Sequence, residues 1–462
     1  MPGSLAEQIY YKMPVLVQNG IFSIYGWTLS RRRYNRFFYD HLARLMEMEW
    51  WSSEQIEEYQ NQRITEIVRH AYGTVPFYRK WYDEHGIDVD RINSISDLNK
   101  LPVLTKNIAK ANQHEMISSA YKRGSLFRVL TSGTTGTPLN IYQTPEGMAY
   151  QWAVWWRHKS RFGLTLKDRE LTFGARVSID QGQWRPPYWR HDYFNNRSYL
   201  STYHFKKKSI DDIVTYLNST HFDFFSGYPS AMYALASLMD EAGLRLYNRP
   251  KYVVTGADAL LPNYELLLRR VFGAPVTEQY GMAEFAGNMS KCQHGKFHVD
   301  FECCHVEALP REGSDCHSLV LTGWGNYAMP FIRYEVGDYV GSADSGCDCG
   351  RKTQCFSSVE GRLEDYVLTP DGRKLIGMNQ VFEYAENARE IQIYQTNCNG
   401  IEFKIVPERG FGDRDKNALI REFRRRAGED MEISFSMVDE LERSSTGKLK
   451  AVVSRVAEYE KH

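Results

Sequence analysis

The sequence has no excess of charge of either sign, because 57 lysine and arginine residues balance 57 aspartate and glutamate residues. A chain that binds nucleic acid over a broad surface usually carries a clear positive excess, so no nucleic-acid partner is expected. The chain also has no basic stretch followed by an apolar core and a small-residue cleavage site at its start. Without this secretion signal, a cytoplasmic location is expected.

Long, uninterrupted apolar runs are missing as well. Residues 13–30 carry no charge, but Pro14, Gly20 and two amide residues interrupt the run, so it does not predict a transmembrane helix. Three arginines follow it directly. Two interpretations stay open for residues 13–38. The segment packs on the core or on a partner subunit, as in a homodimer, or it makes a peripheral contact with a membrane.

Internal repeats and low-complexity tracts are absent too. The chain of 462 residues is longer than one ordinary domain core, so more than one domain is expected. Three kinds of pattern divide the chain. Residues 1–125 are expected to form the helical N-terminal part of a large domain, residues 126–361 its core, and residues 362–462 a small C-terminal domain.

Two successive strand–loop–helix units stand in the middle of the chain. The first strand ends at Gly227, and its helix starts near Pro229 and stops at Gly243; the second helix starts at Pro262 and stops at Gly273. This alternation predicts an α/β fold with mainly parallel sheets covered by helices. In such folds ligands bind where loops leave the carboxyl ends of the strands.

The last hundred or so residues follow a different pattern of strand, strand, helix and strand, which predicts a small α+β domain. It ends in the polar loop ERSSTGKLK at residues 442–450.

One loop has an unusual composition, TSGTTGTP at residues 131–138. Backbone N–H groups and hydroxyls in such a loop can surround phosphate oxygens, and Gly133 and Gly136 let the backbone approach a ligand closely. It is not a Walker A loop, since no Lys-Ser or Lys-Thr pair follows a glycine. Taken alone, a plain polar turn explains the loop equally well.

Four further motifs accompany this loop: YGMAE at 280–284, RYEVGD at 333–338, GRLED at 361–365 and STGKLK at 445–450. Together the five resemble, in order and spacing, the signature motifs of the adenylate-forming enzymes, which include acyl-CoA synthetases, adenylation domains and luciferases. Residues 63–87 and 98–106 resemble the phenylacetate–CoA ligase-like branch. Residues 16–38 are similar to the CapK-like proteins of capsular polysaccharide biosynthesis.

The resemblance implies an ATP-dependent, AMP-forming ligase that activates a small carboxylic acid as an acyl-adenylate and transfers it to CoA. Transfer to a carrier-protein thiol, or to an amine or hydroxyl of a sugar intermediate, is the alternative. A non-catalytic scaffold is disfavoured, because Glu284, Asp338 and Lys448 are all present. Mobility of the small domain about Glu364 and Asp365 is implied as well.

The resemblance also implies roles for individual residues. Lys448 bridges the carboxylate and the α-phosphate, Glu284 positions Mg²⁺ with Thr135, and Asp338 accepts both ribose hydroxyls. Tyr280 stacks on adenine. The remaining nucleotide-binding residues are Ser132, Gly133, Thr134 and Gly136 for the phosphates, Gly256, Ala257 and Asp258 beside adenine, and Gln279, Gly281, Met282 and Arg362. The family usually has Pro-Lys at the end of the phosphate loop, and here Leu139 follows Pro138.

The acyl pocket leaves fewer signs. Aromatic residues form 14% of the chain, and they wall either an apolar acid or simply the core. Tyr228, which precedes Pro229, is the single expected substrate residue.

Cysteines are scarce outside one region, since seven of the eight lie between Cys292 and Cys355. In a reducing compartment, clustered cysteines indicate a metal more often than disulfides. Cys292 and His298 follow YGMAE, and Cys347 and Cys349 follow RYEVGD. Two ligands from each loop predict a structural Cys₃His zinc site, similar to arrangements in phenylacetate-ligase relatives, with His294 as an alternative to His298. Buried, reduced cysteines are the other interpretation.

Overall fold

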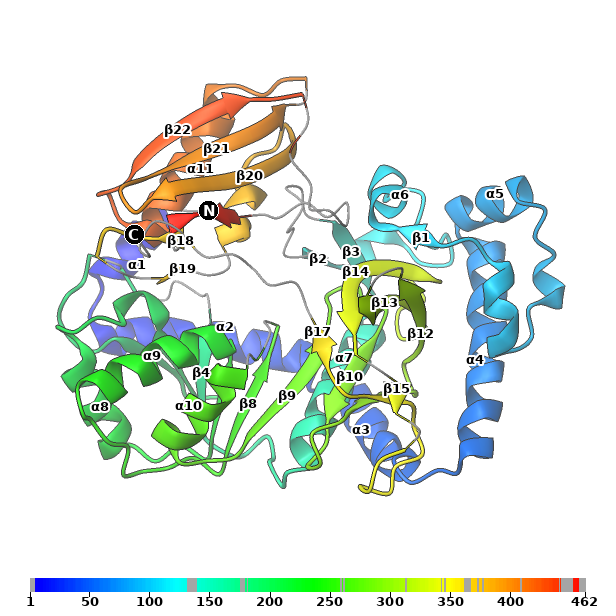
Figure 1. The fold of residues 1–462 in the computed structure, drawn as a ribbon, viewed down its shortest axis with the longest axis horizontal. Coiled ribbons are helices and arrows are strands. Elements are labelled where there is room, and N and C mark those ends of the chain that lie inside the picture. Colours follow the sequence, from blue (N-terminus) through cyan, green and yellow to red (C-terminus); the bar gives the residue numbers. More distant parts are fainter. Residues whose placement is uncertain are drawn as a thin grey trace.

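The computed structural model describes residues 5–130, 139–174, 179–180, 182–257, 260, 262–311, 314–341, 343–344, 346–360, 367–371, 374–375, 378–407, 409–439, 441 and 452–456. The statements below concern these residues. The chain forms a large unit, drawn from blue to yellow in Figure 1, and a smaller one, drawn in orange and red above part of it.

The first part of the chain is helical. Its helices are α1 (Leu5–Lys12), α2 (Val15–Arg33), α3 (Arg36–Met48), α4 (Ser53–Thr74), α5 (Pro76–Glu84) and α6 (Lys106–Ala111). Local chemistry explains the long α4: Ser52 and Gln55 bond each other's backbone N–H groups at its start, and Pro76 sits where a new helix begins. None of the helices among the described residues combines the length and apolar character needed to cross a bilayer.

A ten-stranded sheet forms the centre of the large unit, with the strand order β15-β16-β11-β10-β9-β8-β7-β4-β6-β5. Its strands are β4 (Glu170–Gly174), β5 (Trp189–Asp192), β6 (Arg197–Ser201), β7 (Phe224–Gly227), β8 (Tyr252–Gly256), β9 (Val276–Gly281), β10 (Asn288–Lys291), β11 (Phe297–Val299), β15 (Ala343–Asp344) and β16 (Cys355–Phe356). The five neighbours β6, β4, β7, β8 and β9 run parallel, and the flanking strands pair antiparallel.

Helices cover both faces of the parallel strands. They are α7 (Pro145–Ser160), α8 (Ile210–Ser219), α9 (Pro229–Glu241) and α10 (Pro262–Phe272). Successive side chains of a strand point to opposite faces. Phe224 accordingly packs with Val154 and Trp156 of α7, whereas Phe225 packs with Leu235 of α9 and Phe272 of α10. The predicted alternation of β7, α9, β8, α10 and β9 therefore builds a sheet buried on both sides, and the predicted α/β class is confirmed.

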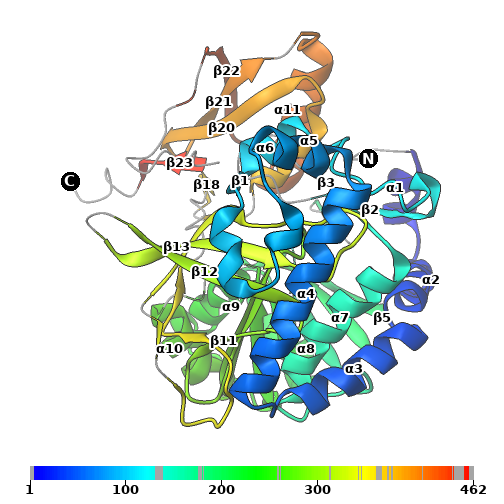
Figure 2. The same cartoon turned by 90° about the vertical axis from the view of Figure 1, so that its right-hand side faces the viewer.

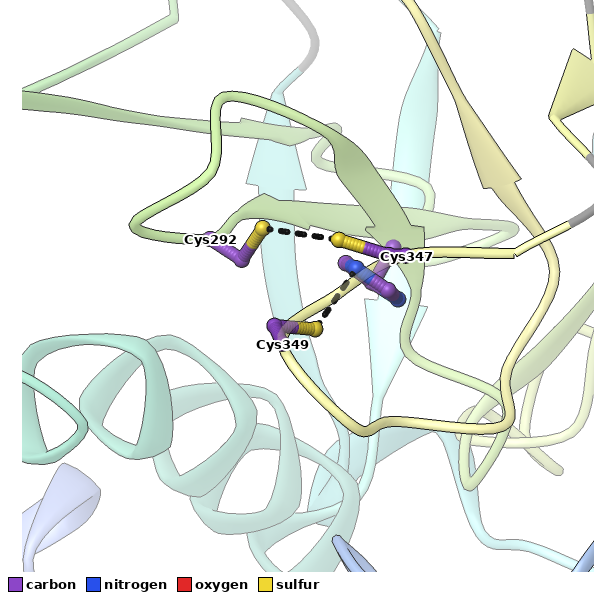
Figure 3. A group of neighbouring side chains, drawn as sticks. Cys292, Cys347 and Cys349 are labelled. Carbon is purple, nitrogen blue, oxygen red and sulfur yellow. Dashed lines mark hydrogen bonds between the residues drawn. The ribbon is translucent and has the colours of Figure 1, made fainter.

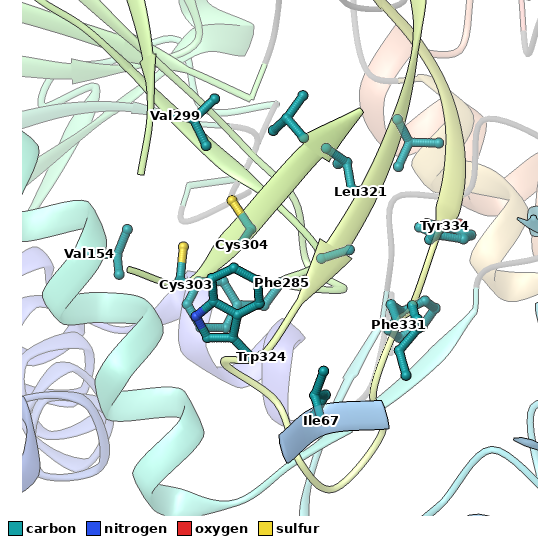
Figure 4. Packing of buried hydrophobic residues seen from close by; sticks show 14 of the residues in the cluster. Ile67, Val154, Phe285, Val299, Cys303, Cys304, Leu321, Trp324, Phe331 and Tyr334 are labelled. Carbon is teal, nitrogen blue, oxygen red and sulfur yellow. The ribbon is translucent and has the colours of Figure 1, made fainter. Parts of the chain in front are cut away.

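A second sheet has five strands, with the order β1-β14-β13-β12 and β17 paired to β14. These are β1 (Leu104–Thr105), β12 (Cys304–Arg311), β13 (Ser314–Gly323), β14 (Tyr334–Val340) and β17 (Val359–Glu360). Only β1 and β14 pair parallel, so both large sheets are mixed. A shared core joins this sheet to α4 and α7. Figure 4 shows Ile67, Val154, Leu321, Trp324 and Phe331 gathered there.

The smaller unit follows the predicted pattern of strand, strand, helix and strand. It contains β18 (Val367–Leu368), β19 (Lys374–Leu375), β20 (Ala388–Asn397), β21 (Gly400–Pro407), α11 (Asp413–Ala427), β22 (Glu432–Met437) and β23 (Val452–Ser454). Leu419 and Phe423 of α11 pack on Ile391 and Phe403 of the sheet. The strand β23 was not expected, and it adds to the sheet parallel to β20.

Candidate active site and cysteine cluster

The expected adenine residues lie at the carboxyl ends of two neighbouring parallel strands. Gly256 ends β8 directly beside Gln279 of β9. A Cβ atom on Gly256 would lie 3.0 Å from the Gln279 carbonyl oxygen, so a residue without a side chain suits this close pairing. Tyr228 follows β7, the next strand along, and its backbone N–H donates to the Phe173 carbonyl over 3.0 Å. The expected site segments that follow β7, β8 and β9 thus all lie at the carboxyl ends of the parallel strands.

The backbone is strained beside three of the motifs. Ala257 has φ +66°, Phe285, which follows Glu284, has φ +54°, and Arg333 at the start of RYEVGD has φ +48°. Only one other described non-glycine residue has a positive φ, Asn196. Such conformations cost of the order of 1–3 kcal/mol each and concentrate at functional sites. Their positions single out the YGMAE, RYEVGD and Gly256–Ala257 segments.

The residues expected to bind adenine and ribose are in direct contact. The Tyr280 hydroxyl donates to Asp338 Oδ2 over 2.7 Å, although 58 residues separate them. A bulge in β14 presents the carboxylate: Glu335 pairs with Val320 and Tyr339 with Ser318, and Gly337 takes φ +79° between them. Both side chains are half-buried. The two sheets therefore meet at this pair.

Glu284, the last residue of the YGMAE segment that Tyr280 begins, is only 9% exposed. The buried Tyr334 hydroxyl lies 3.5 Å from its Oε1 atom and donates to it. Tyr334 belongs to the same strand as Asp338, so the YGMAE and RYEVGD segments contact each other twice.

Gly281 and Met282 complete the described part of this segment. A Cβ atom on Gly281 would lie 2.6 Å from Asn288 Oδ1, an atom that already accepts the Trp155 indole N–H. The Met282 carbonyl accepts a hydrogen bond from Gln151 of α7 over 3.0 Å. Hydrogen bonds from polar residues of α7 thus fix the position of the YGMAE segment. The sequence patterns had not indicated this role.

Several expected residues lie outside the described residues. They are Ser132, Gly133, Thr134, Thr135, Gly136, Asp258, Arg362, Glu364, Asp365 and Lys448. The strands β2 (Phe127–Leu130) and β3 (Asn140–Gln143) flank the phosphate loop and pair antiparallel, with Leu130 opposite Asn140.

Cys292, His298, Cys347 and Cys349 converge, with one ligand atom of each within 4.8 Å of the others. Cys292 and His298 come from the β10–β11 hairpin, and the other two from the loop between β15 and β16. Figure 3 shows the thiols facing one another around an imidazole ring. The two Sγ atoms of Cys292 and Cys347 are 3.6 Å apart, and Cys349 Sγ is 3.3 Å from His298 Nε2. His294, the alternative ligand, is exposed and does not belong to this group.

The surroundings of His298 and Cys349 favour a metal-ligand state, whereas burial raises the pKa of Cys347 to about 12. Burial, and then the positive charges of Arg351 and Arg161, lower the pKa of His298 from 6.5 to about 4, so the ring is neutral at pH 7. Burial raises the pKa of Cys349, but hydrogen bonds from Arg351 outweigh this and bring the pKa below its ordinary value. Thr353 Oγ1 lies 2.9 Å from His298 Nδ1, which leaves Nε2 facing the thiols.

A buried ion network fixes the loop that carries two of the thiols, and sequence reasoning had missed it. Arg351 Nε donates to Glu49 Oε1 over 2.7 Å, and Arg161 Nε lies 2.7 Å from the same oxygen. Arg157 forms ion pairs with Asp300 and Glu302 beside it. These partners lie far apart in the chain, so local periodicity contains no sign of them.

Comparisons with known proteins agree with this arrangement. A family model described as the CapK C-terminal domain matches residues 367–455. Protein CapK of Staphylococcus aureus is 22% identical over 465 residues, covering 98% of this chain and 100% of that protein. Phenylacetate-coenzyme A ligase of Pseudomonas putida is 31% identical over 339 residues, covering 71% of this chain and 75% of the relative.

Solved structures share the fold. The crystal structure of 2-hydroxyisobutyryl-CoA ligase in complex with 2-HIB-AMP and CoA, in the thioesterification state, has a TM-score of 0.57 and 16% identity, covering 89% of this chain and 92% of that one. The same enzyme in the postadenylation state with 2-HIB-AMP has a TM-score of 0.54, with the same identity and coverage. Given its identity to the Pseudomonas ligase over most of that protein, and the motifs that meet between its two sheets, this chain belongs to the phenylacetate–CoA ligase family of adenylate-forming ligases.

Proposed function

We propose that this chain is an ATP-dependent, AMP-forming ligase that activates a carboxylic acid as an acyl-adenylate and passes the acyl group to CoA. The contact between Tyr280 and Asp338 is the observation that carries the proposal. It joins a ring suited to stack on adenine to a carboxylate whose two oxygens suit the two ribose hydroxyls. The relatives named as CoA ligases support the choice of acceptor.

The chemistry of the first step follows from charge. The attacking carboxylate and the α-phosphate of ATP are both anions, so cations must offset their repulsion. We assign the bridging cation to Lys448, and the β- and γ-phosphates to residues 132–136. Glu284 and Thr135 would hold Mg²⁺, which supplies further positive charge at the phosphates when bound. The low exposure of Glu284 keeps bulk water from its carboxylate.

A pyrophosphate-exchange assay with a panel of acids tests the first step. Exchange should depend on one class of acid, and Lys448→Ala should lower it by at least about a hundredfold without changing the melting temperature. Lys404→Ala is the matched control, because this lysine lies over the Tyr394 ring on the sheet of the smaller unit. Exchange that persists in Lys448→Ala would remove the assigned role.

The identity of the acceptor needs a separate measurement. The alignment with CapK covers 98% of this chain, whereas the alignment with the Pseudomonas ligase covers 71%. This difference favours, as a second candidate, an acceptor other than CoA. That acceptor would be a carrier-protein thiol, or an amine or hydroxyl of a sugar intermediate. AMP release that rises with CoA, together with a thioester product, supports the first candidate. Exchange without any CoA-dependent product supports the second.

The domain division of the family is part of the proposal. Residues 1–125 and 126–361 would form the large domain, and residues 362–462 the small one, turning about Glu364 and Asp365 between the two half-reactions. The buried core of the smaller unit, which runs from Val367 to Val452, supports this division because it shares no residue with the other buried cores of the described chain.

We also assign structural zinc to Cys292, His298, Cys347 and Cys349. Three thiols and one imidazole form a Cys₃His donor set, and the hydrogen bond at His298 Nδ1 leaves the other nitrogen for the metal. Elemental analysis of the purified chain should find about one zinc ion per chain. Cys347→Ser should lose it, whereas Cys398→Ser, a half-buried cysteine outside the group, should keep it. A fully active chain without metal would contradict the assignment.

A further inference from the structure

Helix α2 packs on the protein with its polar face. Its buried residues are Gln18, Asn19, Ser23 and Gly26, which recur at helical spacing. An ordinary surface helix does the opposite and buries its apolar stripe.

The buried polar face contacts the edge of the ten-stranded sheet, where β5 pairs with β6 and, among the described residues, with no second strand. Asn19 Oδ1 accepts the His191 backbone N–H over 3.1 Å, and Ser23 Oγ accepts the Tyr193 backbone N–H over 3.0 Å. Gly26 fits closely against Asp192. These side chains satisfy an edge strand that would otherwise present free backbone groups.

Most apolar residues of α2 consequently face away from the protein, whereas the half-buried Phe22 packs against Tyr199 of β6. Exposed fractions reach 75% for Leu16 and 60% for Ile24. The α2 surface consists of Leu16, Val17, Ile21, Ile24, Tyr25 and Trp27, all exposed. Phe194, in the turn between β5 and β6, extends it, since its ring lies 6.3 Å from that of Trp27 and is 62% exposed. Contiguous apolar surface of this kind marks a site that meets another apolar phase.

The charges beside this surface indicate whether it contacts a membrane or another protein. No acidic residue occurs between Glu7 and Asp40, whereas Lys12, Arg31, Arg32, Arg33 and Arg36 all lie there. Of the arginines, Arg31, Arg32 and Arg36 are exposed at the end of the helix and just after it. Figure 2 shows α1, α2 and α3 along one side of the molecule. A helix with outward apolar and aromatic residues and flanking cations has the composition of a helix that lies in the surface of an anionic bilayer.

From these observations we infer that the α2 surface docks this protein on anionic lipid membranes, with the helix lying in the plane of the interface. The apolar side chains enter the acyl boundary, and the exposed arginines meet lipid phosphates. Because the inference rests on α2, the start of α3, β5 and the turn that follows β5, it is independent of the proposed ligase activity. A second copy of the chain is the competing occupant, and the experiment below separates the two.

Co-sedimentation with vesicles tests the inference. The full chain should bind vesicles of phosphatidylcholine and phosphatidylglycerol in equal amounts and bind vesicles of phosphatidylcholine alone far more weakly. Changing Arg31, Arg32 and Arg36 together to Gln should weaken binding by on the order of a hundredfold, about fivefold for each charge. The double variant Leu16→Glu, Ile24→Glu should abolish it. Binding should also fall as salt rises.

The control is Leu266→Glu on α10, which changes an equally exposed leucine (71%) away from α2 and should bind as the unaltered chain does. Circular dichroism and the melting temperature check that each variant folds. Absence of binding to the phosphatidylglycerol vesicles overturns the inference, as does binding that the α2 variants leave unchanged. A dimer in solution that dissociates in the Leu16→Glu, Ile24→Glu variant would assign the surface to a second copy instead.

Discussion

At the scale of single residues, the contact between Tyr280 and Asp338 links two roles that the sequence resemblance assigned separately. Asp338→Asn replaces one carboxylate acceptor by a donor, and a hydrogen bond to a charged group contributes about 1.5–3 kcal/mol. We therefore expect a KM for ATP raised by about 10–100-fold in pyrophosphate exchange. Tyr280→Phe keeps the ring and removes only the orienting hydroxyl, so a rise of about fivefold is expected. Equal, unaltered KM values in both variants would contradict the nucleotide site.

A second residue-scale prediction concerns pH. Burial, and then the charge of Arg161, lower the pKa of His158 from 6.5 to about 3, and Thr277 Oγ1 lies 3.3 Å from its Nε2 atom. Between these two pH values the unfolded chain binds the proton and the folded chain does not. The contribution of His158 to the free energy of unfolding is therefore fully present above pH 6.5, and it falls by about 1.4 kcal/mol per pH unit between pH 6.5 and pH 3.

Urea denaturation at several pH values between 6.5 and 4.5 checks this. His158→Phe should reduce the slope of the free energy of unfolding against pH by about 1.4 kcal/mol per pH unit, which is the contribution of one proton. This holds even if the substitution lowers stability at pH 7. His114→Phe is the matched control, because His114 is exposed at the surface. If stability does not change over this range, the buried neutral ring is excluded.

At the scale of elements, Gly227 determines how β7 leaves the sheet. It has φ +131°, and a Cβ atom there would lie 1.9 Å from the Phe173 carbonyl oxygen of β4. Gly227→Ala should therefore lower the free energy of unfolding by at least about 3 kcal/mol. Gly243, just after α9, has φ +65°, but a Cβ atom there would meet open space. Gly243→Ala should therefore lower the free energy of unfolding by only about 1 kcal/mol. Equal losses in the two variants would show that the contact with β4 has no effect.

Element boundaries also show what the sequence could predict. Pro229 and Pro262 begin α9 and α10, and Gly243 and Gly273 follow these helices with positive φ, as local punctuation indicated. Local patterns do not contain strand partners. The antiparallel additions β10, β11 and β16 were therefore not predicted, since their order depends on pairing between distant segments. The same reason hid the ion pairs of Arg157 with residues more than a hundred positions away.

Helix α2 illustrates a different limit. Its sequence shows an uncharged stretch interrupted by amides, and this pattern left two interpretations open. The direction of each face depends on what the helix covers, and it covers a sheet edge rather than an apolar core. Only the three-dimensional arrangement could show that polar residues point inward. The cysteine group was easier, because ligand type and spacing indicated it before the fold was known.

At the scale of the whole molecule, the separate buried cores predict separate unfolding transitions. The core of the smaller unit lies between Val367 and Val452, and the contacts across to the large unit include an ion pair of Lys206 with Asp371 and a 3.5 Å hydrogen bond from Arg425 to the Tyr11 hydroxyl. Exposed or half-exposed polar contacts contribute about 1 kcal/mol or less each. A hydrogen bond between Tyr203 of the large unit and the buried Arg426 of α11 adds to them. Polar contacts of this kind couple the two units weakly compared with the buried apolar residues inside each.

Calorimetry of the full chain should accordingly resolve two transitions. Phe403→Ala removes a fully buried ring from the core of the smaller unit and should lower only its transition, at a loss of about 3–5 kcal/mol. Phe225→Ala, its counterpart between the large sheet and α10, should lower only the other. Weak coupling is what a domain that turns between two half-reactions requires, because a cooperative interface would have to be broken in every catalytic cycle. A single transition that both variants shift equally would show that the units fold as one body.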